Sequence, residues 1–183
     1  MSTGTNPLRK LGRLCHTPTN VGTAWPHGGT GMGLVSAAKL YVQSSGSRVV
    51  VAEEFGEVVD TIQGGRSVWL ACMLRDWDAD ALAIHWTKTA GAVTGKPLLS
   101  IPNTNRAGKL GSALAKKLLW TPRDQTNGIS ALFYSAIPEL DPELVLSFSV
   151  FSEFRQAVVF RCIRSGTKAI GQIGTLADLT LSP

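Results

Sequence analysis

Carboxylates gather in one part of the chain, between residues 53 and 80. The set is Glu53, Glu54, Glu57, Asp60, Asp76, Asp78 and Asp80. Acids at this density can bind a divalent cation, share a proton in general acid–base catalysis, or stand on the polar edge of a sheet. The apolar run RSVWLACML at residues 66–74 separates them into two groups, so each group must be judged from the element that carries it.

The first group lies around a predicted break between strands. The run RVVVAEE, residues 48–54, alternates as a strand does, Phe55 and Gly56 interrupt it, and EVVDTIQ at residues 57–63 alternates again. Neighbouring residues of a strand point to opposite faces, so Glu53 and Glu54 cannot form a close pair, and Glu57 and Asp60 diverge too. A working pair of carboxylates is therefore disfavoured here.

The second group is better explained as the start of a helix. In DWDADALAIHW, residues 76–86, the apolar residues recur at helical spacing, Asp76 suits the N-cap, and acids in the first turns match the helix dipole. A calcium loop would need Gly at its sixth position and Glu at its twelfth, where this chain has Ala81 and Thr87.

No other motif supplies chemistry. GAVTGKP at residues 91–97 has too few residues between its glycines for a phosphate loop, and Pro97 stands where such a loop has Ser or Thr. The histidines and the cysteines show no metal-ligand spacing, and the odd number of cysteines without C-x-x-C indicates buried free thiols. We therefore expect no catalytic site, no metal and no cofactor, and a binding or structural role.

Composition indicates a folded protein without a membrane span. Of 183 residues, 44% are hydrophobic and 17% charged, and no apolar run approaches the ~18–20 residues of a transmembrane helix. The N-terminal residues have no apolar stretch of the signal-peptide type, which predicts a protein made and kept in a cytoplasm. The net charge of +5 is not arranged as a basic stripe with aromatics, so direct recognition of DNA is disfavoured.

The pattern of elements predicts a mainly β fold. Residues 1–33, rich in Gly and Pro, are expected to form an irregular N-terminal arm in which Trp25 packs on another element or another chain. Residues 34–183 are expected to form a single β-rich domain, a β-sandwich or barrel with one short flanking α-helix and a long loop at residues 88–112. Within it, SSGS at residues 44–47 predicts a turn, and Gly64–Gly65 predicts a hairpin.

The remaining strand-like runs alternate with turn residues. Residues 34–43 place Leu34, Ser36, Ala38, Leu40 and Val42 on one face, and residues 66–74, apolar on both faces, predict a buried central strand. The last third predicts a β-meander over residues 115–120, 129–138, 143–154, 156–164, 168–174 and 176–181.

Two stretches carry a resemblance to a known class of protein. They are GGTGMG, EEFGEVVD and GGRSVWLACMLRDWDADAL in the first half, and LLWTPRDQTNGISALFYSAIPELDPELVLSFSVFSEFRQAVVFRCIRSGTKAIGQIGTLADLTL in the second. Over about residues 28–87 and 114–181 the chain resembles virion structural proteins of tailed bacteriophages, most of all the tail tube protein. The motifs are patterns of residue type and contain no invariant chemistry.

The resemblance implies a β-sandwich or barrel assembled as hexameric rings that stack into a tube for DNA ejection. Its partners would be copies of itself and other virion proteins, with DNA as passing cargo, in a tail assembled in the cytoplasm of the host bacterium. Such lumens tend to be acidic, whereas this chain carries +5, so its basic residues would lie on arms and ring contacts. The candidates for assembly contacts are Arg9, Lys10, Arg13, Trp25, His27, Lys96, Arg106 and Lys109. The candidates for lumen or inter-subunit acids are Glu53, Glu54, Glu57 and Asp60.

Three alternatives stay open. The chain could build another virion part, namely a tail terminator, a head–tail connector or a capsid decoration protein. It could be a small β-rich carbohydrate-binding or hydrolytic protein that uses one of the acids between Glu53 and Asp60. It could also be a nucleic-acid-binding barrel, which steeply salt-dependent binding to DNA would reveal.

Overall fold

The computed structural model describes residues 11–44, 46–51, 58–63, 65–75, 87–90, 97–100, 111–123, 125, 128–139, 156–164 and 169–182. Within these ranges the chain is built from strands, with two short 3-10 helices, η2 (Gly111–Leu114) and η3 (Leu176–Asp178). The strands are β1 (Gly12–His16), β2 (Thr30–Ser44), β3 (Ser47–Val51), β4 (Val58–Gln63), β5 (Arg66–Leu74), β6 (Thr87–Ala90), β7 (Pro97–Ser100), β8 (Lys116–Pro122), β9 (Ile129–Glu139), β10 (Gln156–Cys162) and β11 (Gly171–Thr175).

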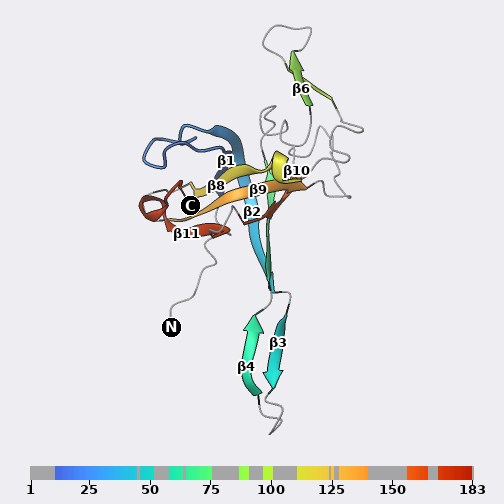
Figure 1. Cartoon of the computed structure of the whole chain (residues 1–183). Helices are drawn as coiled ribbons and strands as arrows, with labels where there is room; N and C mark the ends of the chain where they lie inside the picture. Colours follow the sequence, from blue (N-terminus) through green and yellow to red (C-terminus); the bar gives the residue numbers. More distant parts are fainter. Residues whose placement is uncertain are drawn as a thin grey trace.

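Six of these strands close into an antiparallel barrel (Figure 1). The order is β10-β5-β2-β1-β8-β9, and pairing of β9 with β10 closes the ring. Strand β9 is long enough to bond to two strands along the same edge, β11 through residues 129–133 and β10 through residues 136–139. Closure leaves these six strands with few free edges, which removes the commonest route to uncontrolled strand pairing. The predicted mainly β fold is confirmed in the form of a barrel.

One face of each barrel strand fills the interior. Sixteen buried residues form this core, and Leu14, Leu70, Leu118 and Trp120 are completely inaccessible. Strand β5 has the burial pattern expected of such a wall, with alternating buried and half-buried residues from Val68 to Leu74. The long apolar run of residues 66–74 thus reflects one face in the core and a second face that is only partly covered.

A second apolar layer covers the outside of β1, β8 and β9. Cys15, Leu119, Leu132, Tyr134 and Leu179 are buried in it, with help from partly buried neighbours. The C-terminal segment after β11 supplies the cover and is held by hydrogen bonds. The Lys117 Nζ donates to the Leu181 carbonyl at 2.6 Å, and the Tyr134 hydroxyl donates to the Thr180 carbonyl at 3.1 Å.

Replacing Tyr134 by phenylalanine tests this cover. The substitution keeps the ring and leaves the Thr180 carbonyl without its donor, so we expect the free energy of unfolding to fall by about 0.5–1.5 kcal/mol. Urea denaturation followed by circular dichroism measures the change. Tyr41→Phe is the control, because Tyr41 is 50% exposed, and an equal loss in both variants would contradict the assignment.

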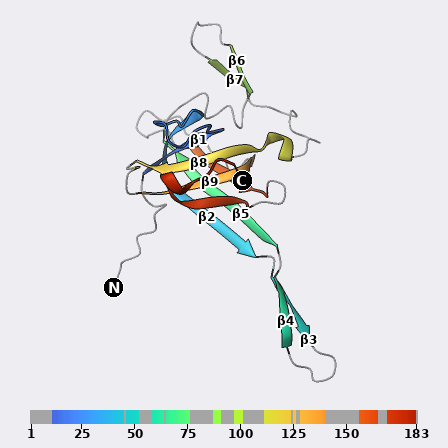
Figure 2. The same cartoon turned by 60° about the vertical axis from the view of Figure 1, so that its left-hand side comes forward.

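Strands β2 and β5 continue beyond the barrel as β3 and β4. Ser44 pairs with Arg66 and Ser47 pairs with Gln63, so the same register runs on across the interruption. Both views show the β3–β4 pair extending away from the barrel (Figures 1 and 2). We call the antiparallel pair formed by residues 39–51 and 58–71 the ribbon.

The ribbon corrects two predictions of turns. The residues SSGS do not reverse the chain, because β2 and β3 run in the same direction, and Gly64–Gly65 does not form a hairpin between β4 and β5. Glycine predicts local freedom of the backbone, but continuous pairing with the opposite strand decides its direction here.

Other differences have equally local causes. Residues 12–16, predicted to be irregular, form β1 between β2 and β8, where paired neighbours on both sides hold a short strand. The predicted 88–112 loop contains an antiparallel pair, β6 with β7, on the opposite side of the barrel from the β3–β4 pair (Figure 2). The final predicted strand, residues 176–181, begins instead as η3. The predicted α-helix at residues 76–86 and the strand at residues 143–154 lie outside the described residues.

The predicted alternation in β2 holds for only part of the strand. Ala38 is buried and Leu40 packs on the core, as expected, but Val35 is buried in place of Leu34. The register shifts between Ser36 and Lys39, and such a bulge moves the inward phase by one residue. A sequence pattern of period two carries no sign of that shift.

Candidate functional site

Most of the acids between residues 53 and 80 lie outside the described residues. Only Asp60 falls in a described element, β4, where it pairs with Val50 of β3. Glu53, Glu54, Glu57 and the three aspartates at 76, 78 and 80 are not in the described ranges. Among the residues that are described, no three His, Cys, Asp or Glu side chains come together as a metal site. No helix of the described part is long and apolar enough to cross a membrane.

The three cysteines are free and buried, as the sequence predicts. Burial raises the pKa of Cys15, Cys72 and Cys162 from 9.0 to about 12, since a thiolate would lose its hydration; for Cys162 a backbone hydrogen bond at Leu70 opposes this. At neutral pH these thiols are therefore protonated and poor nucleophiles.

The buried thiols predict a loss of stability in alkali. The unfolded thiols ionise near pH 9, whereas the folded ones keep their protons to about pH 12, so the unfolded chain binds fewer protons in this window. Stability is thus complete below pH 9 and falls above it, by up to about 1.4 kcal/mol per pH unit for each thiol. Urea unfolding at several pH values measures the slope. Cys72→Ala should reduce it by one thiol's share, and an unchanged slope would contradict the assignment.

Three predicted contact residues lie in the described N-terminal region and are already engaged within the subunit. The Arg13 guanidinium stacks over the Trp25 ring at 5.2 Å, and the same ring lies against Gly31, where it leaves no room for a Cβ. His27 is completely buried, at a left-handed backbone φ of 59°. Trp25 therefore packs on another element of its own chain. The five basic candidates at 9, 10, 96, 106 and 109 lie outside the described residues.

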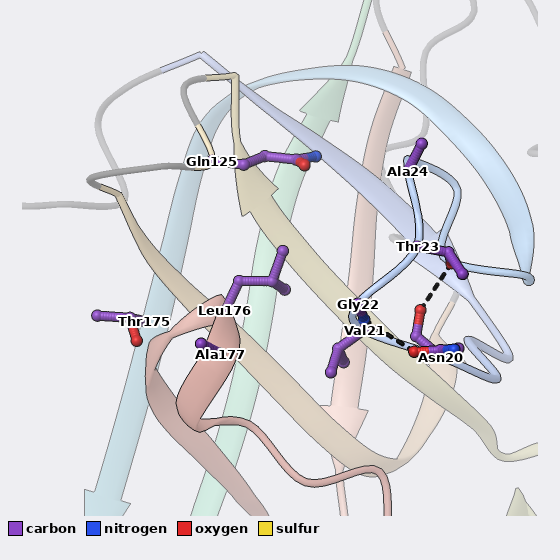
Figure 3. Close-up of a pocket in the computed structure, with 9 residues that line it drawn as sticks. All are labelled: Asn20, Val21, Gly22, Thr23, Ala24, Gln125, Thr175, Leu176 and Ala177. Carbon is purple, nitrogen blue, oxygen red and sulfur yellow. Dashed lines mark hydrogen bonds between the residues drawn. The ribbon is translucent and has the colours of Figure 1, made fainter.

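A pocket of about 780 Å³ lies between the loop after β1 and the C-terminal turn (Figure 3). Its lining consists of Asn20, Val21, Gly22, Thr23, Ala24, Gln125, Thr175, Leu176 and Ala177. The Asn20 side chain is occupied in its own loop, accepting a hydrogen bond from the Gly22 amide at 2.9 Å. No lining side chain is ionisable, so the pocket offers neither an acid–base group nor a nucleophilic thiol.

A second hollow, of about 480 Å³, lies on the outer face of β2, β5 and β10. Its lining is Tyr41, Val42, Gln43, Trp69, Ala71 and Val159, and we call it the groove. Tyr41 is 50% exposed and Val42 59% exposed, although large apolar side chains on a barrel wall are usually covered. The groove begins where the ribbon leaves the barrel.

Pairing across the three strands sets the layout of the groove. Tyr41 pairs with Trp69, and Trp69 pairs with Arg161, so these three form one row across the outer face. The next row on that face is formed by Lys39, Ala71, Val159 and Glu139.

Charges stand at the rim of the groove. Arg161 stacks over the Trp69 ring at 5.7 Å, and its Nε bonds to the Glu139 carboxylate at 2.6 Å. The other donors of that guanidinium remain available for a second acceptor, and its side chain is 52% exposed. Lys39 is exposed at the end of the neighbouring row. The groove is thus an apolar floor with an aromatic pair, flanked by two cations and one paired carboxylate.

Sequence reasoning did not single out this groove. Alternation does place Lys39, Tyr41 and Gln43 together on one face, but residues 66–74 look buried on both faces. The signal that could have found it is the exposed-face tyrosine beside a strand whose tryptophan lies in the opposite phase to Val68 and Leu70.

What the groove can do is bind an apolar or aromatic group beside a carboxylate, which is the chemistry of a protein contact. Within the described part of the chain, no three potential metal ligands gather around it. A comparison of the chain with models of protein families and with curated proteins finds no match.

Proposed function

We propose that this chain is a structural subunit of a bacteriophage virion, a tail tube protein that assembles with copies of itself into stacked hexameric rings around a DNA channel. The observation that carries the proposal is the groove, an exposed aromatic and aliphatic surface on a barrel whose opposite wall is covered by its own chain. Exposed apolar hollows with a polar rim are typical of surfaces that another protein covers.

The ribbon supports the same function. A two-stranded extension has little core of its own, and in water such a pair is only marginally stable alone. Residues that continue a barrel strand pair outward into solvent are therefore expected to gain stability from a neighbouring subunit. The barrel provides a rigid unit for repetition, since closure leaves it few edges for uncontrolled pairing.

In this function the chain performs no chemical step and needs no cofactor. Heterologous contacts between copies close a ring, and further contacts tie one ring to the next. The protein is made in the cytoplasm of the host and ends in the virion tail. The +5 charge would be borne by ring contacts and outer surfaces, so that passing DNA is not held by its phosphates.

Imaging and mass measurement of the purified protein test the proposal. Light scattering after size exclusion should report oligomers, and negative stain should show rings or tubes about 10 nm across or smaller, given a domain of this size. Rings that never stack at any concentration would favour a tail terminator or a connector. A protein that stays monomeric at high concentration would contradict every ring-forming role.

A further inference from the structure

The groove needs an occupant with an apolar group and negative charge. Its floor presents Tyr41 and Trp69, and its rim presents Lys39 and the remaining donors of Arg161. An aromatic or aliphatic side chain would fill the floor, and a carboxylate beside it would accept from the rim cations. A basic or fully polar segment would leave either the floor or the cations without partners.

The chain itself contains a segment with that composition. Residues 53–57 read Glu-Glu-Phe-Gly-Glu, which places one aromatic residue among three acids, and Asp60 follows. The segment joins β3 to β4, so it belongs to the end of the ribbon opposite to the groove. The ribbon is therefore electrically asymmetric, basic where it leaves the barrel and acidic at its tip.

The tip cannot reach the groove of its own subunit. From Val42 to Val51 the strand spans nine residues, which at about 3.3 Å per residue is roughly 30 Å. The pairing of β3 with β4 continues the register of β2 with β5, and this holds the ribbon extended. A segment that fits the groove but is kept away from it must serve another copy.

We infer that residues 53–57 at the ribbon tip of one subunit dock in the groove of the next, with Phe55 against Tyr41 and Trp69 and the glutamates facing Lys39 and Arg161. The contact is heterologous, because the tip and the groove are different surfaces, and repeated around an axis it closes a ring. This inference rests on the proposed self-assembly and names the surfaces that make it.

Cross-linking between copies tests the contact directly. Two proteins, one with Tyr41→Cys and one with Phe55→Cys, are mixed under mild oxidation, and disulfide-linked peptides are identified by mass spectrometry. The native thiols do not interfere, because all three are buried. Docking should raise the yield of the 41–55 link about tenfold or more over the control, since it raises the effective concentration of the two thiols.

The matched control is Ile173→Cys mixed with Phe55→Cys, because Ile173 is about as exposed as Tyr41 and lies on β11, away from the groove. Equal yields for positions 41 and 173, or links that join Tyr41→Cys only to itself, would overturn the inference. If rings form in negative stain without a 41–55 link, the inference fails and the proposed function stands. A 41–55 link between copies that form neither rings nor tubes supports the docking and overturns the tube.

A charge exchange gives a second, independent readout. Lys39→Glu should weaken association at low salt, and adding Glu54→Lys to the same chain should restore it. Lys116→Glu is the control, as Lys116 is exposed at the start of β8. Restoration supports a facing pair of charges, whereas loss of association in all the variants alike would count against it.

Discussion

Replacing Trp120 by alanine is expected to lower the free energy of unfolding by about 3–5 kcal/mol, enough to unfold a domain of marginal stability. Trp120 is completely inaccessible and belongs to the interior core of the barrel. Its truncation removes the largest buried side chain of that core, and a closed ring of strands can collapse only partly around the void. Urea denaturation with two independent probes measures the loss. Ile173→Ala, at an exposed position, should change stability by less than about 0.5 kcal/mol.

The same ring explains why residue 12 has no side chain. A Cβ at Gly12 would lie 2.5 Å from atoms of the Trp120 ring, which is far inside van der Waals contact. Gly12→Ala should therefore cost about 1–3 kcal/mol in the native background. In the Trp120→Ala background the clash is gone, so the cost should shrink and the two substitutions should couple by about 0.5–3 kcal/mol. Additive costs would show that the two residues do not share this space.

Replacing Tyr41 by glutamate should weaken association between subunits by about thirtyfold or more while leaving the barrel folded. Tyr41 is half exposed, so the folded monomer loses little, but an aromatic anchor at the centre of a contact is worth about 2 kcal/mol or more. The new carboxylate would also repel an acidic occupant. Light scattering over a range of concentrations measures the shift toward monomer.

The control for this variant is Ile173→Glu. Both residues are large, apolar and exposed on strands of the same protein, but only Tyr41 lines the groove. Thermal unfolding of the two monomers should agree to within experimental error. If both variants assemble as the unchanged protein does, the groove is not a contact surface.

Much of the strand content follows from local pattern. The runs around Leu40, Leu70, Trp120 and Phe160 alternate or are continuously apolar because one or both faces meet a core, and they do form barrel strands. In β8 both faces are covered, since Trp120 points into the interior core while its neighbour Leu119 lies in the outer apolar layer. The buried thiols were predictable too, from the odd count of cysteines and the missing C-x-x-C.

Other features could not be predicted from local pattern. Residues 12–16 look irregular because Gly12 and the prolines that follow dominate the composition, yet two neighbouring strands pair with this segment on both sides. The bulge in β2 and the straight passage from β4 into β5 depend on the register of the opposite strand. The groove depends on three strands meeting at one outer face, which no single run encodes.

By itself, the sequence determined the fold class, the positions of most described strands and the lack of a recognisable catalytic motif, because side-chain alternation and turn residues act over a few positions. Only the tertiary structure decided that the barrel closes through β9 and β10, that Trp25 and His27 are used within the subunit, and that Tyr41 and Trp69 share an exposed groove. The physical reason is range: strand pairing joins residues far apart in the chain, and the free energy of those contacts does not appear in any local pattern.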